Sequence, residues 1–328
     1  MVKRFGDTIY KSVTLVVAAG SILFIISAVA VLLFTAYPSI VSNELGFFTS
    51  ANWNPSLSGT VETVNGVHRL TGSSFGILVF IADTIASSGI AVLLAVPAGL
   101  GVAIFLTEIA PRRISAPISF MVEMLAGIPS VVYGFWGLLV LGPYLFYTVE
   151  PYLSQHLGFI PIFSGPISSP GLLSAGIILA IMIIPIVASI SQDMMARTPK
   201  ETREGAKALG LTRWEVTRKI VLPYAKTGIV GSIVLGLGRA LGETMAVAML
   251  AGSGVQILPK SLYYPFSTIA SYMLLNLGAA VTDPSGMELS AIMELGLVLL
   301  AITVTVNIVA RLLIKQGFAS SSENAVRV

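Results

Sequence analysis

The sequence of 328 residues contains no cysteine and only two histidines, His68 and His156. The missing cysteines exclude disulfides and thiolate chemistry. Both histidines fall in expected loops, so a histidine-rich metal site is excluded as well. Charged residues are also scarce, at 11% of the chain against about 25% in a typical soluble domain. A soluble metal or thiol enzyme is therefore a poor interpretation of this sequence.

Two further patterns are missing. The sequence has no Gly-x-x-x-x-Gly-Lys-Ser/Thr phosphate loop, so we do not expect it to hydrolyse ATP in the manner of P-loop proteins. No candidate nucleophile lies beside a suitable base in the sequence. We therefore expect no catalytic residue and no bound metal or cofactor in this chain.

Apolar residues are abundant, at 55%, and the mean hydropathy is +0.89. A water-soluble fold cannot bury so much apolar surface, whereas a bilayer can solvate it. The first long apolar run exceeds the core of a signal peptide, about 7–15 residues, so we expect it to remain as a span. A membrane helix needs about 20 mostly apolar residues. The predicted fold class is thus all-α integral membrane, with six spans at 13–37, 75–107, 117–147, 172–194, 226–251 and 289–314.

The distribution of lysine and arginine predicts the orientation. Arg69 and Lys260 lie in loops expected outside, and Arg239 lies within a span. The other 16 of the 19 basic residues fall in segments on the side of the N-terminus. By the positive-inside rule, both termini are expected in the cytoplasm. The net charge of +3 and the pI of about 9.1 then reflect topology, and no nucleic-acid partner is expected.

The outer loops are expected to carry some structure. Residues 61–64 and 67–70 alternate as strands do, and Asn65-Gly66 between them favours a β-hairpin with a type I′ turn. This hairpin is either a solvated cap or a contact for an external partner. The region 252–288 predicts a short surface helix, with interfacial aromatic residues at positions 263, 264, 266 and 272.

The cytoplasmic loop 198–223 predicts two short helices around a tight turn. Capping boxes begin at Thr198 and Thr212, and the first helix is expected to stop at Gly210, which tolerates positive φ. The second helix is expected to end before Pro223. The loop is either a solvated basic connection or a protein contact, and the apolar turn with Leu209, Leu211 and Trp214 favours a contact.

The spacing in this loop resembles the EAA loop of ABC importer permeases. The family pattern is Glu-Ala-Ala, three residues, Gly, nine residues, then Ile, any residue and Leu-Pro. Only Gly205 departs from it, in place of the first alanine. In that family the loop forms the coupling helix, which sits in a groove of a separate ATPase. The resemblance implies that coupling involves Glu204, Gly205, Ala206, Leu209, Gly210, Leu211, Trp214, Ile220, Leu222 and Pro223.

Charges inside the bilayer are expensive and usually functional. Arg239 and Glu243 are four residues apart, which predicts one shared helical face, and glycines at 236, 238 and 242 allow close approach. The pair is either a structural ion pair or a gate in which Glu243 releases Arg239 to a crossing anion. Glu123 and Glu294 are further expected partners of Arg239 on the substrate path. Asp83 is expected to be solvated near the outer end of its span.

Several stretches resemble the Pst-type phosphate permeases: Glu108–Arg113, Val122–Gly134 and Gly238–Ala246. The outer stretch Gly46–Pro55 is similar to the C-type subunit. The resemblance implies the type I (MetI-like) importer fold and ATP-driven inward transport of inorganic phosphate across the cytoplasmic (inner) membrane. It also implies an A-type permease in a heterodimer, two copies of a P-loop ATPase that uses the ATP, and an external phosphate-binding protein, with membrane lipid around the spans.

Alternatives remain at this point. Another oxyanion, such as sulfate, molybdate or tungstate, would fit the same residues, and so would a membrane sensor or scaffold subunit that transports nothing. The predicted segments are an N-terminal span with its outer loop at 1–74, a permease core at 75–315 and a cytoplasmic tail at 316–328.

Overall fold

The computed structural model describes residues 2–55, 60–64, 66–168, 170–251 and 258–325. The chain forms two compact units, one of Met1–Gly76 with Asn276–Val298 and one of Ile77–Leu275 with Leu299–Val328. The predicted segments 1–74, 75–315 and 316–328 were defined by their expected function and not by internal contacts. They remain a prediction.

Six helices in the described part of the chain are long and apolar enough to cross a membrane, which confirms the predicted number. Four of them overlap the predicted spans closely, whereas the third and the fifth are displaced, the fifth from 226–251 to Arg213–Gly242. The predicted span 117–147 is split by Pro129, which is non-helical with ψ 137° and ends the preceding helix. The six are Ile9–Asn43, Leu78–Ile109, Ser130–Leu157, Leu172–Ala196, Arg213–Gly242 and Met287–Leu312.

The first unit contains α1 (Val2–Asn43), α2 (Gly46–Thr49), the two strands and the first part of α14 (Met287–Ala325). Two hydrogen bonds join α1 to α14. The hydroxyl of Ser39 donates to Glu294 Oε2 at 2.6 Å, and the backbone N–H of Ser39 donates to Ser290 Oγ at 2.9 Å. Because an unpaired polar group in an apolar environment is costly, these bonds fix how the two helices meet.

The predicted β-hairpin is confirmed. β1 (Val61–Val64) pairs antiparallel with β2 (Val67–Leu70), with Val61 opposite Leu70 and Val64 opposite Val67. Arg69 and Glu62 form a cross-strand salt bridge at 3.0 Å. Gly66 has φ +80°, as a tight turn requires. Asn65 lies outside the described residues, so the turn type stays a prediction.

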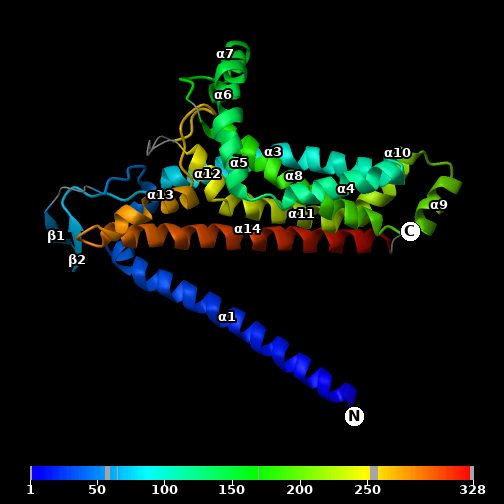
Figure 1. Ribbon diagram of the computed structural model, residues 1–328, viewed down its shortest axis with the longest axis horizontal. Helices are drawn as coiled ribbons and strands as arrows, with labels where there is room; N and C mark the ends of the chain where they lie inside the picture. The colour runs from blue at the N-terminus through cyan, green and yellow to red at the C-terminus, as the bar shows by residue number, and fades with distance from the viewer. Residues whose placement is uncertain (1, 56–59, 65, 169, 252–257, 326–328) are drawn as a thin grey trace. The chain divides into compact units, whose positions relative to one another are not determined.

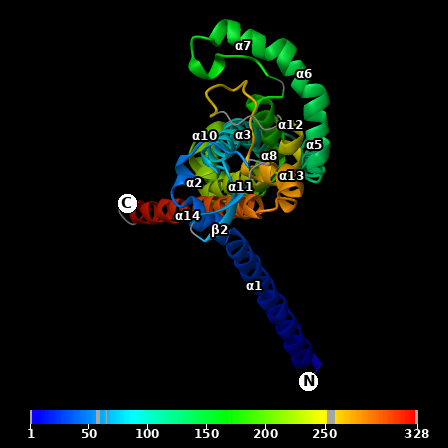
Figure 2. The same cartoon turned by 90° about the vertical axis from the view of Figure 1, so that its left-hand side faces the viewer.

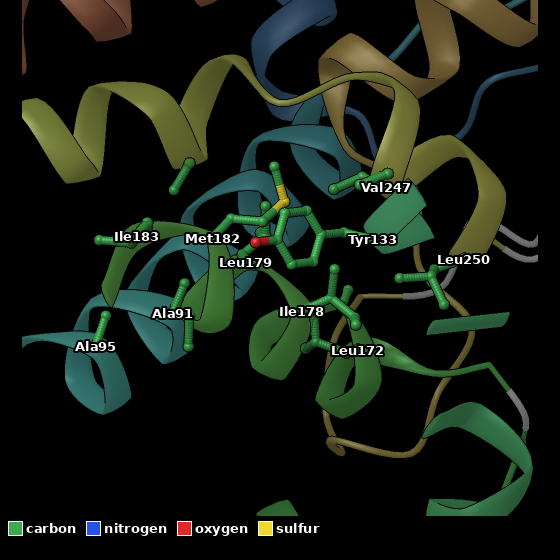
Figure 3. Close-up of a cluster of buried hydrophobic side chains, with 14 of the residues drawn as sticks. Ala91, Ala95, Tyr133, Leu172, Ile178, Leu179, Met182, Ile183, Val247 and Leu250 are labelled. Atoms are coloured by element: carbon green, nitrogen blue, oxygen red, sulfur yellow. The ribbon is translucent and has the colours of Figure 1, made fainter. Parts of the chain in front are cut away.

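The core of the second unit is built around α8 (Leu172–Ala196), which packs along α3 (Leu78–Ile104) and α11 (Leu222–Gly242). Both views show these three helices side by side (Figures 1 and 2). In α8 67% of the most apolar window is buried, since a helix that is apolar on all faces is placed centrally. Figure 3 shows Ile178, Leu179, Met182 and Ile183 meeting side chains that include Ala91, Ala95, Tyr133, Val247 and Leu250.

The second unit contains further elements, not all of which pack on this core. The segment from α5 to α7 curves away from the bundle in both views (Figures 1 and 2). The bounds are η1 (Phe105–Ile109), α4 (Arg112–Ala126), α5 (Ser130–Trp136), η2 (Gly137–Leu141), α6 (Gly142–Tyr144), η3 (Leu145–Val149), α7 (Glu150–Leu157), η4 (Pro161–Phe163), α9 (Lys200–Ala208), α10 (Arg213–Val216), η5 (Thr217–Val221) and α12 (Met245–Leu250). Helix α13 (Ile269–Val281) confirms a short helix within 252–288, and its place along the outer surface stays a prediction; its residues belong partly to this unit and partly to the first.

The segment before α13 corrects two predictions. Asp83 is 0% exposed rather than solvated, and its Oδ2 accepts the backbone N–H of Ser267 at 2.8 Å. Three of the aromatic residues predicted at the membrane interface, Tyr263, Phe266 and Tyr272, are instead buried within the protein. The physical reason is that irregular backbone at membrane depth must be covered by protein and must satisfy its own hydrogen bonds.

Asp83 provides a stability test of this arrangement. We expect Asp83→Ala to lower the unfolding temperature of the purified protein, because the buried N–H of Ser267 would lose its acceptor, at a cost of about 1–3 kcal/mol. Asp83→Asn keeps an acceptor oxygen and is the matched control, with a smaller expected loss. Equal unfolding temperatures for the alanine variant and the wild type would contradict the role of this hydrogen bond.

Candidate functional site

The turn between α9 and α10 has the predicted form. Gly210 follows α9 with φ +85°, and its N–H donates to the carbonyl of Lys207 at 2.9 Å. The next N–H, that of Leu211, donates to the carbonyl of Ala206 at 3.3 Å. A left-handed glycine thus ends the helix by satisfying carbonyls of its last turn.

Only the second of the two predicted capping boxes is confirmed. Thr212 Oγ1 accepts the N–H of Glu215, and Glu215 Oε2 accepts the N–H of Thr212. The first box is wrong, because Pro199 rather than Thr198 directly precedes α9 and no side chain caps that helix. The Thr198 hydroxyl is buried instead, with 3% of the residue exposed.

The second helix of the loop also differs from the prediction. It does not end before Pro223, since α10, η5 and α11 follow one another without a break. The wider π-type turn of η5 directly precedes Pro223, and such turns accommodate a missing backbone donor. The fifth span therefore begins inside the loop, at Arg213, and the second half of the loop is part of that span.

Two apolar side chains stand out from this turn. Leu209 is 83% exposed and Trp214 is 58% exposed. Glu204 and Gly205 are exposed beside them, whereas Ala206 is buried. A Cβ on Gly205 would meet nothing within 4 Å, so the departure from the family pattern leaves the packing unchanged. Exposed apolar groups rimmed by charge are typical of a protein contact.

Behind this surface the loop is packed onto the spans. A buried apolar cluster brings Ala206, Val216 and Val221 of the loop together with Ala103 of α3 and Met195 of α8. This cluster gives the exposed turn a rigid base, because closely packed side chains transmit displacement.

Sequence reasoning missed one polar contact at the same place. Arg203 of α9 forms a salt bridge with Glu108 of η1 at 2.5 Å and donates to the carbonyl of Met195 at 2.6 Å. In the sequence, Arg203 contributed only to the predicted orientation of the chain, and Glu108 was only part of a stretch that resembles the family. The single available signal was an acidic residue at the end of a predicted span, on the side where the basic loop was predicted.

The fifth span is interrupted beside the predicted gate. Helix α11 ends at Gly242, and Glu243 is extended with φ −69° and ψ 127°. Arg239 and Glu243 therefore do not share a helical face, and that prediction is wrong. Glu243 Oε1 instead accepts the N–H of Ala246 at 3.3 Å, at the start of α12. The carboxylate thus supplies an acceptor to one of the free backbone donors in the first turn of α12.

Arg239 lies in the last turn of α11 and is half-buried. Its Nε is buried without a hydrogen-bond partner among the described residues. Within the described part of the second unit, it forms no ion pair with Glu243 or Glu123. It lies near Tyr133, whose hydroxyl donates to the carbonyl of Leu125 at 2.9 Å. The guanidinium thus has an unsatisfied donor, among the described residues, close to this break in the helix.

The other predicted path residues are placed differently. Glu123 lies on α4 and is exposed, so its assignment to the third span is wrong. Glu294 is buried in α14 of the first unit, where Ser39 is its hydrogen-bond partner. Of the three predicted glycines, only Gly236 is in close approach, since a Cβ there would lie 2.6 Å from Ile183 Cγ2. Open space surrounds Gly238 and Gly242.

No cluster of His, Cys, Asp or Glu side chains in the described ranges is arranged to hold a metal ion. The two assembled features are thus the exposed turn on the coupling loop and the arginine at the interrupted span. Neither of them has the nucleophile and base that a catalytic site requires.

Comparison with known proteins places the chain in a family. Residues 95–316 match the family described as binding-protein-dependent transport system inner membrane component. The phosphate transport system permease protein PstC 1 of Mycobacterium bovis is 38% identical, over 86% of this chain and 85% of that protein. PstC of Mesorhizobium japonicum is 40% identical, over 94% and 91%, and PstC of Haemophilus influenzae is 46% identical, over 73% and 76%.

Solved structures support the same fold. The MetNI methionine ABC transporter in an inward-facing conformation matches with a TM-score of 0.50 and 18% identity, over 73% of this chain and 94% of that chain. A bacterial alginate ABC transporter matches with a TM-score of 0.50 and 18% identity, over 72% and 80%. With its six spans, the chain is a multi-pass inner membrane protein of MetI-like fold, and it belongs to the binding-protein-dependent transport system inner membrane components, among the PstC phosphate permeases.

Proposed function

We propose that this chain is the permease subunit that carries inorganic phosphate inward through an ATP-driven importer. The names of its relatives support phosphate as the cargo. The observation that carries the proposal is the Arg239 Nε, buried without a hydrogen-bond partner among the described residues. A guanidinium binds phosphate oxygens in bidentate fashion, and transporters place anion sites at interruptions of their helices.

Glu243 has a supporting role in this proposal. Its carboxylate lies at the same interruption and caps α12 in this structure. When no anion is present, Glu243 turns toward Arg239 and compensates its charge, and an arriving phosphate displaces it. Such an exchange avoids leaving a bare charge inside the membrane. Glu294, buried in its own span, is retained as a further path residue, whereas the exposed Glu123 is not.

The proposed assembly supplies what this chain lacks. An A-type permease completes a heterodimer, two copies of a P-loop ATPase bind and hydrolyse the ATP, and an external binding protein delivers phosphate. Both termini lie in the cytoplasm, on the side where lysine and arginine concentrate. The exposed Leu209 and Trp214 then face the ATPase.

The mechanism is alternating access. ATP closes the paired ATPases and moves the coupling loops together. Because α10, η5 and α11 are continuous, this movement passes directly into the fifth span, which carries Arg239 at its far end. The spans open outward to receive phosphate, and hydrolysis returns them to the inward-open state.

A second oxyanion is a competing cargo, because a guanidinium offers the same fork to sulfate, molybdate or tungstate as to phosphate. Competition for uptake into liposomes by these anions decides between them. ATP-dependent uptake of any of them excludes a sensor or scaffold subunit without transport.

Arg239 provides the first functional prediction. We expect Arg239→Gln to reduce phosphate uptake by about 30-fold or more, the range that follows from losing a charged partner, about 2–5 kcal/mol. The complex should still assemble, because Arg239 forms no ion pair in the described part of its unit. Arg239→Lys keeps the charge but loses the fork, and it should retain part of the uptake. Uptake at normal affinity in Arg239→Gln would exclude the gate.

Leu209 tests the docking surface. Leu209→Asp should weaken binding of the ATPase by about 30-fold, as expected for an apolar interface residue worth about 2 kcal/mol. The side chain is 83% exposed, so the fold of the free chain should be unaffected. Leu209→Met keeps an apolar side chain and is the matched control. The measurement is co-purification of the ATPase with each variant, and equal recovery from both would contradict docking through this turn.

A further inference from the structure

Arg203 connects the coupling helix to the ends of two spans. It projects from the middle of α9, and one guanidinium nitrogen binds Glu108 Oε1 while the other donates to the carbonyl of Met195. The first partner belongs to η1, which ends α3, and the second lies in the last turn of α8. The side chains of the ion pair are only 17% and 14% exposed, so water screens the contact weakly.

The direct packing between α9 and these spans is otherwise thin. Helix α9 packs mainly on α10 and η5, which are parts of its own loop. Two hollows of about 370 and 340 Å³ open where it faces η1, α4 and α8, and Arg203 lines both of them. Ala206 contacts these span ends through the apolar cluster. A second contact between α9 and the span ends is made by the Arg203 side chain, through its two hydrogen bonds.

The carboxylate of Glu108 is stabilised at its position by the guanidinium of Arg203 that is bound to it. Glu108 lies at the carboxyl end of a helix, where the helix dipole disfavours an anion. Arg203 reaches the carboxyl end of α8, where the dipole favours a cation. If Arg203 left, Glu108 would lose the guanidinium that binds it, and only Lys207 and Arg213 of the same hollow would remain as nearby cations. The contact therefore has one strongly preferred arrangement and resists sliding of α9 along the spans.

We infer that Arg203 is a positioning residue that transmits the movement of the docked coupling helix to α3 and α8. The inference rests on the proposed function, because it requires an ATPase bound at this loop. Arginine is needed rather than lysine, since a single ammonium does not reproduce the fixed fork that reaches both acceptors. The fifth span receives the movement through the continuous helix, and Arg203 adds the second and fourth spans.

The test uses the complete complex in liposomes and measures ATP hydrolysis and phosphate uptake in the same preparation. We expect Arg203→Gln to retain the bound ATPase and its basal hydrolysis while the phosphate taken up per ATP falls about fivefold or more, the scale of a typical coupling between two sites. Glu108→Gln should lower the same ratio, because it removes the charge of the partner. Arg203→Lys should restore part of the ratio.

Arg218 is the matched control. It is an exposed arginine in η5 of the same loop and lines neither hollow, and Arg218→Gln should leave the ratio unchanged. An unchanged ratio in Arg203→Gln, with normal uptake in the wild type, overturns the inference and leaves the proposed function intact. If Arg203→Gln fails to assemble, the ratio measured for Arg203→Lys decides, and a wild-type value there also overturns the inference. Absence of ATP-dependent uptake in the wild type overturns both proposals.

Discussion

The need to satisfy every backbone polar group inside a bilayer governs this structure. Regular helices meet this requirement by themselves, so the chain can leave the helix only where protein supplies the partners. The segment before α13 illustrates the rule, because Asp83 and Thr84 of α3 accept the N–H groups of Ser267 and Ile269. At the interruption of the fifth span, Glu243 accepts the N–H of Ala246. Irregular backbone and polar side chains therefore occur together, and the candidate transport site is one of these places.

The two functional features lie at opposite ends of one continuous helical run. The turn with Leu209 precedes α10, and Arg239 lies in the last turn of α11. Helices are stiff along their axis, so a displacement of the turn reaches the arginine without a flexible joint between them. The apolar cluster and the Arg203 contacts connect the same turn to α3 and α8. In the proposed mechanism, one docking surface thus acts on three spans of the second unit.

Local sequence rules predicted much of this architecture. Spans follow from long apolar runs, the hairpin from alternation around Asn-Gly, and the coupling turn from Gly210, since each depends on residues near one another in the chain. The same rules failed where a proline interrupts an apolar run. Pro129 split a predicted span, whereas Pro223 was accommodated by the π-type turn before it. Backbone hydrogen bonding around each proline therefore decides whether the helix continues.

The sequence by itself determined the solvent of this protein, the number of its spans and the place of its coupling turn. Only the tertiary structure decided which polar groups meet. Arg203 and Glu108 are 95 residues apart, and Glu243 was predicted beside Arg239 but lies past the end of the helix. The physical reason is the distance along the sequence over which each interaction acts. Hydrophobic periodicity and turn chemistry act over a few residues, whereas the partner of a buried charge depends on how distant helices pack.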